Sequence, residues 1–91
     1  MDGASVPVMP RGVRMQFDKV RDGWVLLAPE RAIRLDPIGH AILSEVDGAR
    51  SIDVISAILA ARYAAPVAEI GKDCGEFVGA LVARRILDLA A

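Results

Sequence analysis

Apolar and polar residues alternate over residues 13–17, which is the period of a β-strand with one buried face. A second apolar run covers residues 24–27. It directly follows Asp22 and Gly23, a dipeptide that favours two-residue type I′ turns because both central positions of such turns need a positive φ. Residues 30–35 can return as a third strand. The pattern predicts a meander of three antiparallel strands.

Pro29 lies between the second and third predicted strands and should end the second, because proline has no N–H to donate to a ladder. Ile33 and Leu35 would then share one face of the third strand. The outer side of the third strand in a meander has no neighbour. Its backbone N–H and C=O groups are therefore expected to be available to an added strand.

Helical signals dominate the rest of the chain. Asp36 followed by proline predicts an N-cap and first turn, with a helix over about 37–46. Ser51 is the next expected N-cap and opens a helix over 52–63. Apolar residues at helical spacing predict a third helix over about 66–85.

Three glycines, Gly71, Gly75 and Gly79, recur every fourth residue beside the apolar stripe of the third predicted helix. Each glycine costs about 1 kcal/mol relative to alanine in a helix interior. Such a line indicates that something approaches the helix closely. Another helix of the same chain and an exposed groove for a partner both satisfy this requirement.

The predicted order is strand, strand, strand, helix, helix, helix, an α+β fold of winged helix-turn-helix-like topology. The sheet is three-stranded and antiparallel, and the three helices follow it. Residues 1–10 contain glycine and proline with no period, which predicts a flexible arm or a linker remnant. The folded domain is expected to span residues 11–91.

Charge and composition narrow the choice of partner. Eleven Lys and Arg residues against twelve Asp and Glu residues give a net charge of −1, which disfavours a nucleic-acid partner held through phosphates. A hydrophobic content of 54% and a mean hydropathy of +0.39 indicate more apolar surface than so short a chain buries easily. A protein or peptide partner is therefore expected. One cysteine and no long apolar run predict a reducing, cytoplasmic setting without secretion or membrane insertion.

Candidate catalytic groups are few. His40 is the only histidine, and we expect it at the surface or its boundary rather than as a general base. Cys74 falls on the apolar stripe of the third predicted helix, where a buried, unreactive thiol is expected. No phosphate-binding glycine loop occurs. The sequence therefore predicts no enzyme activity, no cofactor and no metal site.

Strand addition is the binding mode that these features favour. The backbone of residues 31–35 would supply main-chain hydrogen bonds to an extended peptide. The third helix would supply an apolar wall beside it, with its glycines leaving room. The wall residues are expected to be Phe77, Val78, Leu81 and Val82.

Two arginines on the third predicted strand allow two interpretations. Arg31 and Arg34 can meet an acidic residue of the incoming peptide. Alternatively they form a solvated face in which Arg34 pairs across the sheet and discourages aggregation. A proline at Ile33 is expected to remove one donor from this edge.

The chain resembles the family of protein D of pyrroloquinoline quinone (PQQ) biosynthesis, PqqD, from about Pro10 to Leu89. The resemblance rests on Trp24-Val25-Leu26-Leu27-Ala28-Pro29-Glu30-Arg31, Leu35-Asp36, Asp47-Gly48, Arg50-Ser51, and the spacing of Ile70, Asp73, Phe77, Leu81 and Arg85.

This resemblance implies a non-catalytic peptide chaperone, a recognition element for ribosomally made and modified peptides. Such a protein would bind the precursor peptide PqqA and present it to the radical S-adenosylmethionine enzyme PqqE. The peptide would add beside the third strand and pack against the third helix. The expected peptide-binding residues are Arg31, Ala32, Ile33, Arg34, Leu35, Asp73, Phe77, Val78, Leu81, Val82 and Arg85.

Two other functions stay open at the level of sequence. One is a winged-helix domain that binds DNA, and the other is a dimerisation module that uses the same apolar surface. The sequence leaves the choice between monomer and homodimer open.

Overall fold

The computed structural model describes residues 1–90 and confirms the predicted α+β fold class. Short strands β1 and β5 lie near the two ends of the chain, and between them three strands precede three helices. The elements are β1 (Pro7–Val8), β2 (Arg14–Asp18), β3 (Gly23–Ala28), β4 (Arg31–Arg34), α1 (Pro37–Ser44), α2 (Ile52–Tyr63), α3 (Val67–Ala83) and β5 (Asp88–Leu89).

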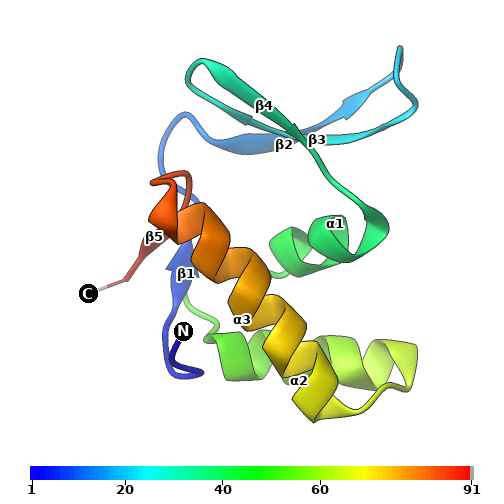
Figure 1. Ribbon diagram of the computed structural model, residues 1–91, viewed down its shortest axis with the longest axis vertical. Helices are drawn as coiled ribbons and strands as arrows, with labels where there is room; N and C mark the ends of the chain where they lie inside the picture. The colour runs from blue at the N-terminus through cyan, green and yellow to red at the C-terminus, as the bar shows by residue number, and fades with distance from the viewer. Residues whose placement is uncertain (91) are drawn as a thin grey trace.

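Two layers make up the molecule (Figure 1). The antiparallel sheet, in the order β2-β3-β4, lies over α1, and α2 lies on the far side of α1. Helix α3 packs against α2 and runs from there up to the level of α1. Strands β1 and β5 pair antiparallel in a separate two-stranded sheet beside α3. In the larger sheet β4 is an edge strand, because within residues 1–90 it pairs only with β3.

The first hairpin differs from the predicted two-residue turn. Asp18 pairs with Gly23, so residues 19–22 all belong to the loop and Gly23 is the first residue of β3. The Asp18 carboxylate accepts hydrogen bonds from the N–H groups of Val20 and Arg21 at 3.0 and 3.2 Å, which stabilises this longer loop. Asp22 has a positive φ, 53°, but Gly23 does not, so a type I′ turn over these two residues is ruled out.

The second hairpin is the tighter one. Ala28 pairs with Arg31, and Pro29 and Glu30 form the turn between them. The fixed φ of proline suits the first central position of a turn, and Glu30 takes a left-handed φ of 64° at the second. Pro29 therefore ends β3 as predicted.

Helix caps follow the sequence signals closely. Asp36 Oδ1 accepts a hydrogen bond of 2.6 Å from the Gly39 N–H, and the Ser51 hydroxyl accepts one of 3.2 Å from the Val54 N–H. The bounds of α2 are those predicted. Helix α1 ends at Ser44 and α3 at Ala83, in each case two residues before the predicted end. Arg85, with a φ of 60°, has left the helical conformation.

Residues near the N-terminus differ from the predicted flexible arm. Pro7 is buried, and β1 pairs with β5. The carbonyls of Gly3 and Ser5 each accept a 2.9 Å hydrogen bond, from the Asp53 and Ile52 N–H groups respectively. These donors belong to the first turn of α2, which has no partners inside its own helix. The N-terminal segment thus supplies acceptors to the free N–H groups at the start of α2. No local sequence pattern predicts this contact, because its partners lie about 50 residues apart in the chain.

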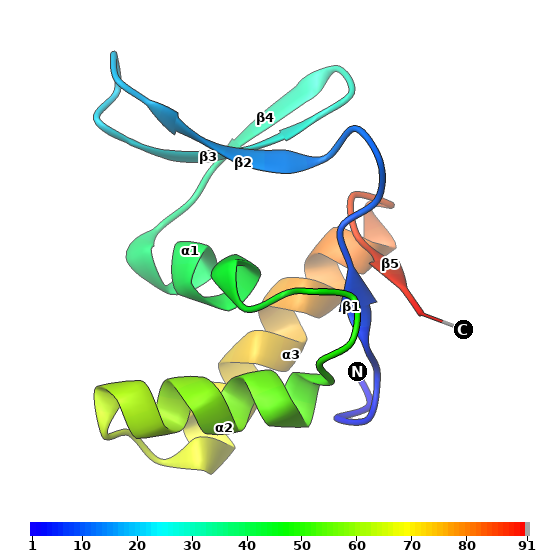
Figure 2. The same ribbon diagram turned by 180° about the vertical axis from the view of Figure 1, so that it is seen from behind.

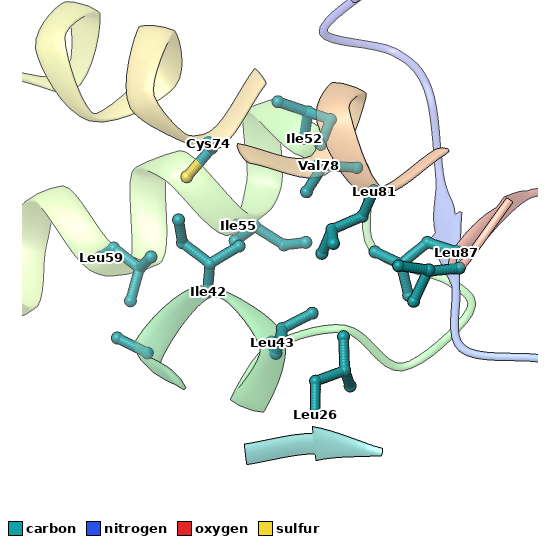
Figure 3. Close-up of a cluster of buried hydrophobic side chains, with 12 residues drawn as sticks. Leu26, Ile42, Leu43, Ile52, Ile55, Leu59, Cys74, Val78, Leu81 and Leu87 are labelled. Atoms are coloured by element: carbon teal, nitrogen blue, oxygen red, sulfur yellow. The ribbon is translucent and has the colours of Figure 1, made fainter. Parts of the chain in front are cut away.

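The core joins the sheet to the helices (Figure 3). Leu26 of β3 is fully buried and points toward Leu43 of α1. Behind them lie Ile55 of α2 and Val78 of α3, both with 0% exposure. The sheet is therefore held over the helices largely through the inward face of its central strand.

The three glycines of α3 do not mark a close backbone contact. A Cβ at Gly71 would lie 3.7 Å from the Ser56 hydroxyl of α2, and one at Gly79 would lie 3.9 Å from the tip of Met1. A Cβ at Gly75 would meet nothing within 4 Å. Only Gly71 faces another helix at ordinary van der Waals distance, so a tight helix crossing does not account for the line.

We predict that Gly75→Ala raises the free energy of unfolding by about 1 kcal/mol, because alanine restricts the unfolded chain and fits the open space at this position. Urea denaturation followed by circular dichroism measures the change. Gly39→Ala in α1 is the matched control, since its Cβ would lie 3.0 Å from the Phe77 ring. The control should gain less stability than Gly75→Ala. An equal or smaller gain for Gly75→Ala would contradict this packing.

Candidate functional site

The free edge of β4 is the first part of the site. The Leu35 N–H donates a 2.9 Å hydrogen bond to the Trp24 carbonyl, continuing the ladder between β4 and β3. Hydrogen-bonded pairs alternate along an antiparallel ladder, so Arg31 and Ile33 also direct their backbone groups toward β3. The backbone N–H and C=O groups of Ala32 and Arg34 therefore point away from the sheet. We call these outward groups the β4 edge.

This geometry corrects the expectation for a proline at Ile33. The Ile33 N–H points toward Leu26 inside the sheet, so proline there would break the β3–β4 ladder rather than remove an outward donor. The outward donors belong to its two neighbours. Sequence alternation identifies the faces of a strand but does not say which residues form the hydrogen-bonded pairs.

Side chains along β4 divide between two faces. Ile33 and Leu35 are partly buried and pack against the hydrophobic core. Ala32 and Arg34 are exposed on the opposite face of the sheet. The predicted shared face of Ile33 and Leu35 is confirmed, and it is the face turned toward the helices.

Phe77 of α3 lies where β4 leads into α1. Together with Arg34, Leu35 and Asp36 it lines an open hollow of about 360 Å³, which we call the Phe77 hollow. Its ring rests against α1 because Gly39 has no side chain: a Cβ there would lie 3.0 Å from Cε1 and Cζ of the ring. The β4 edge and an aromatic side chain of α3 thus lie beside the same hollow.

The predicted helical wall is only partly present. Val78 and Leu81 have exposures of 0% and 5%, so they are part of the buried core and do not line a surface. Val82 is five residues from Phe77, about 140° around the helix axis, so the two side chains leave α3 on different flanks. Gly71 faces α2 and Gly79 faces Met1, whereas Phe77 lies against Gly39 of α1, so these glycines do not make room beside Phe77.

Other residues share the flank of Phe77. In Figure 1 both β4 and α3 lie toward the viewer, and in Figure 2 α3 lies behind α1 and α2. Residues at spacings of four, three and four along α3 and its end fall on one flank. They are Asp73, Phe77, Ala80 and Arg84, of which all but Phe77 are exposed. Ala80 and Arg84 were not among the residues predicted from the sequence, although their spacing from Phe77 could have revealed them.

The arginines of β4 are exposed, and neither forms an ion pair within residues 1–90. Arg34 in particular does not pair across the sheet. Arg85, beyond α3, is also exposed and has no ion pair in the same part of the chain. Unpaired positive charge therefore accompanies the β4 edge.

The two candidate catalytic groups occupy structural positions. Cys74 is a buried free thiol in α3, and burial raises its pKa above the ordinary value, despite an opposing contact with the Ser56 hydroxyl. The His40 ring stacks on Trp24 with centroids 4.5 Å apart. Among residues 1–90, no three His, Cys, Asp or Glu side chains gather as metal ligands would. No helix in that range has the length and apolar character needed to cross a membrane.

Cys74 should resist alkylation in the folded protein, because its raised pKa keeps the thiol protonated at pH 8 and only the thiolate reacts. Mass spectrometry after iodoacetamide treatment, with and without urea, measures the rate. Modification should become at least about tenfold faster when the protein unfolds. Equal rates in the two conditions would show that the thiol is accessible in the fold.

The fold places this chain among winged-helix-like α+β domains, with β4 as a free edge strand of its sheet. A family model for coenzyme PQQ synthesis protein D (PqqD) matches residues 23–87. The chain belongs to the PqqD family, as its resemblance to that family predicted.

Individual relatives cover nearly the whole chain. It is 46% identical over 89 residues to the PqqA binding protein of Rhizobium meliloti, covering 98% of this chain and 91% of the relative. It is 43% identical over 83 residues to the PqqA binding protein of one Xanthomonas oryzae strain, covering 91% and 90%.

Solved structures agree with the fold. The solution structure of the PqqD part of Methylobacterium extorquens PqqCD, described as a functional, stand-alone recognition element for ribosomally synthesised and modified peptides, matches with a TM-score of 0.84. Identity is 42%, over 96% of this chain and 93% of that one. The crystal structure of PqqD from Xanthomonas campestris matches with a TM-score of 0.64 at 40% identity, over 98% and 99%.

Proposed function

We propose that this chain is a non-catalytic peptide chaperone that binds the precursor peptide PqqA by strand addition at the β4 edge and presents it to the radical S-adenosylmethionine enzyme PqqE. The observation that carries the proposal is the outward backbone of Ala32 and Arg34 beside the Phe77 hollow. The relatives named PqqA binding protein and the recognition element of Methylobacterium extorquens support the choice of ligand. The setting we propose is the cytoplasm.

Main-chain hydrogen bonds would supply much of the affinity. An extended peptide opposite Ala32 and Arg34 can accept from their N–H groups and donate to their C=O groups, which satisfies an otherwise unpaired edge. Each such bond contributes about 1 kcal/mol net, so two residues of ladder need additional side-chain contacts for tight binding.

The side-chain contacts would come from α3 and from the inner face of β4. Phe77 offers a partly buried aromatic surface, and Ile33 and Leu35 extend the apolar face along the strand. Asp73 and Arg85, both exposed, are proposed as polar contacts at the margin of the site, together with Arg84. Val78 and Leu81 contribute by holding the Phe77 side of α3 against the core.

The exposed face of α3 supports a peptide partner over a DNA duplex. Glu69, Asp73 and Glu76 are exposed there, and they balance the positive charges of Lys72, Arg84 and Arg85. Such a helix would bring no net positive charge to the phosphates of a major groove. Binding of a peptide through main-chain hydrogen bonds does not need a positively charged helix.

Presentation to PqqE needs the peptide to remain partly free. An added strand covers only the residues that pair with β4, so segments on either side can enter an enzyme active site. Holding one end of the peptide raises the local concentration of the other end at the enzyme when both proteins associate.

We predict that Ala32→Pro weakens PqqA binding at least about tenfold, because it removes an outward N–H and places ring atoms where the peptide backbone would lie. Proline is tolerated in an edge strand, so the fold should survive. Isothermal titration with synthetic PqqA measures the affinity. The control is Ala32→Val, which keeps the N–H and favours strand geometry.

The same pair of variants tests presentation. With PqqE, S-adenosylmethionine and a reductant supplied, the valine variant should support formation of the cross-linked peptide, and the proline variant should not. Retained affinity in a folded Ala32→Pro protein would contradict binding at the β4 edge. Full cross-linking with that variant, or without any added chaperone, would contradict the presentation step.

A further inference from the structure

The register of β4 also bears on which peptide sequence the edge would accept, an inference that rests on the proposed function. Cross-strand neighbours place their side chains on the same face of a sheet. A peptide residue opposite Arg34 would therefore lie on the exposed outer face. The peptide residues before and after it would lie opposite Ile33 and Leu35, on the face that packs toward the helices.

The inner face offers three apolar contacts to such a peptide. Ile33 and Leu35 pack against the core, and Phe77 lines the hollow next to Leu35. A peptide side chain placed there loses contact with water, so an aliphatic or aromatic residue is favoured over a charged one.

The outer face offers one unpaired charge at the central position. In the row across the sheet, Arg34 follows Val25 and Gln16, both neutral. Two acidic residues, Asp22 and Asp36, line the depressions that Arg34 also lines, but neither forms an ion pair with it. Asp36 Oδ1 instead accepts the short hydrogen bond from the Gly39 N–H. Arg34 is thus held at the edge with its guanidinium available to a carboxylate.

We infer that Arg34 is a specificity-determining residue, which selects a peptide segment with an acidic residue between two apolar residues. The carboxylate would meet Arg34 on the outer face, and the two apolar side chains would pack toward Ile33, Leu35 and Phe77. The pattern reads the same in both chain directions, so it holds for parallel and antiparallel addition alike.

The test reverses the charge on each side of the contact. Arg34→Glu should weaken the binding of synthetic PqqA about tenfold, since an attraction becomes a repulsion. Each acidic residue of PqqA is then replaced by arginine, one per peptide. One of these peptides should bind the Arg34→Glu variant more tightly than unchanged PqqA binds that variant. The same peptide should bind the unaltered protein more weakly than unchanged PqqA does. Alanine at either neighbour of that acidic residue should also weaken binding.

Arg14→Glu is the matched control. Arg14 lies on the same outer face, in the row of Leu27 and Ala32, but on the opposite edge strand β2. It changes the net charge equally and should alter the affinity less than about twofold. An amide NMR spectrum of each variant checks the fold.

Several results would overturn the inference. These are unchanged affinity of a folded Arg34→Glu protein, no charge-reversed peptide that restores binding, or an equal effect of Arg14→Glu. Each leaves strand addition intact as long as Ala32→Pro still weakens binding as predicted. If Ala32→Pro binds normally, the proposed function fails first.

Discussion

The antiparallel pairing of β3 with β4 is the constraint on which the site depends. The Leu35–Trp24 hydrogen bond fixes the phase of the ladder, and the phase decides that Ala32 and Arg34 have outward backbone groups. A slip of one residue would exchange the two faces, exposing Ile33 and turning Arg34 toward the core. The tight Pro29-Glu30 turn and the apolar face of β4 both oppose such a slip.

Packing then places this edge beside α3. Leu26 in the central strand links the sheet to Leu43 of α1, and α1 in turn receives the Phe77 ring against Gly39. The same helix α1 is capped by Asp36, immediately after β4. A short segment of chain therefore sets both the end of the strand and the position of the aromatic side chain beside it.

Much of the fold could be predicted from the sequence because its signals are local. The Asp36 and Ser51 caps, the bounds of α2 and the shared face of Ile33 and Leu35 all depend on residues close together in the chain. The first hairpin was predicted wrongly because the Asp18 carboxylate stabilises a loop that the Asp22-Gly23 signal does not describe. The order near the N-terminus depends on pairing with β5, at the other end of the chain.

The candidate site was predicted less completely than the fold. Helical spacing identified Phe77 but could not show that Val78 and Leu81 lie in the core, or that Gly71 faces α2. Which backbone groups of β4 point outward depends on hydrogen-bond phase, which no side-chain pattern encodes. Ala80 and Arg84 share the flank of Phe77, and their helical spacing from Phe77 is the one sequence signal that points to them.

Amide hydrogen exchange, followed by NMR with and without PqqA, tests the central claim most directly. The amides of Ala32 and Arg34 should exchange rapidly in the free protein and become protected on binding, while those of Arg31 and Ile33 are already protected by β3. Protection that appears instead at Met15 and Phe17 of β2, or at no strand edge at all, would contradict strand addition at β4.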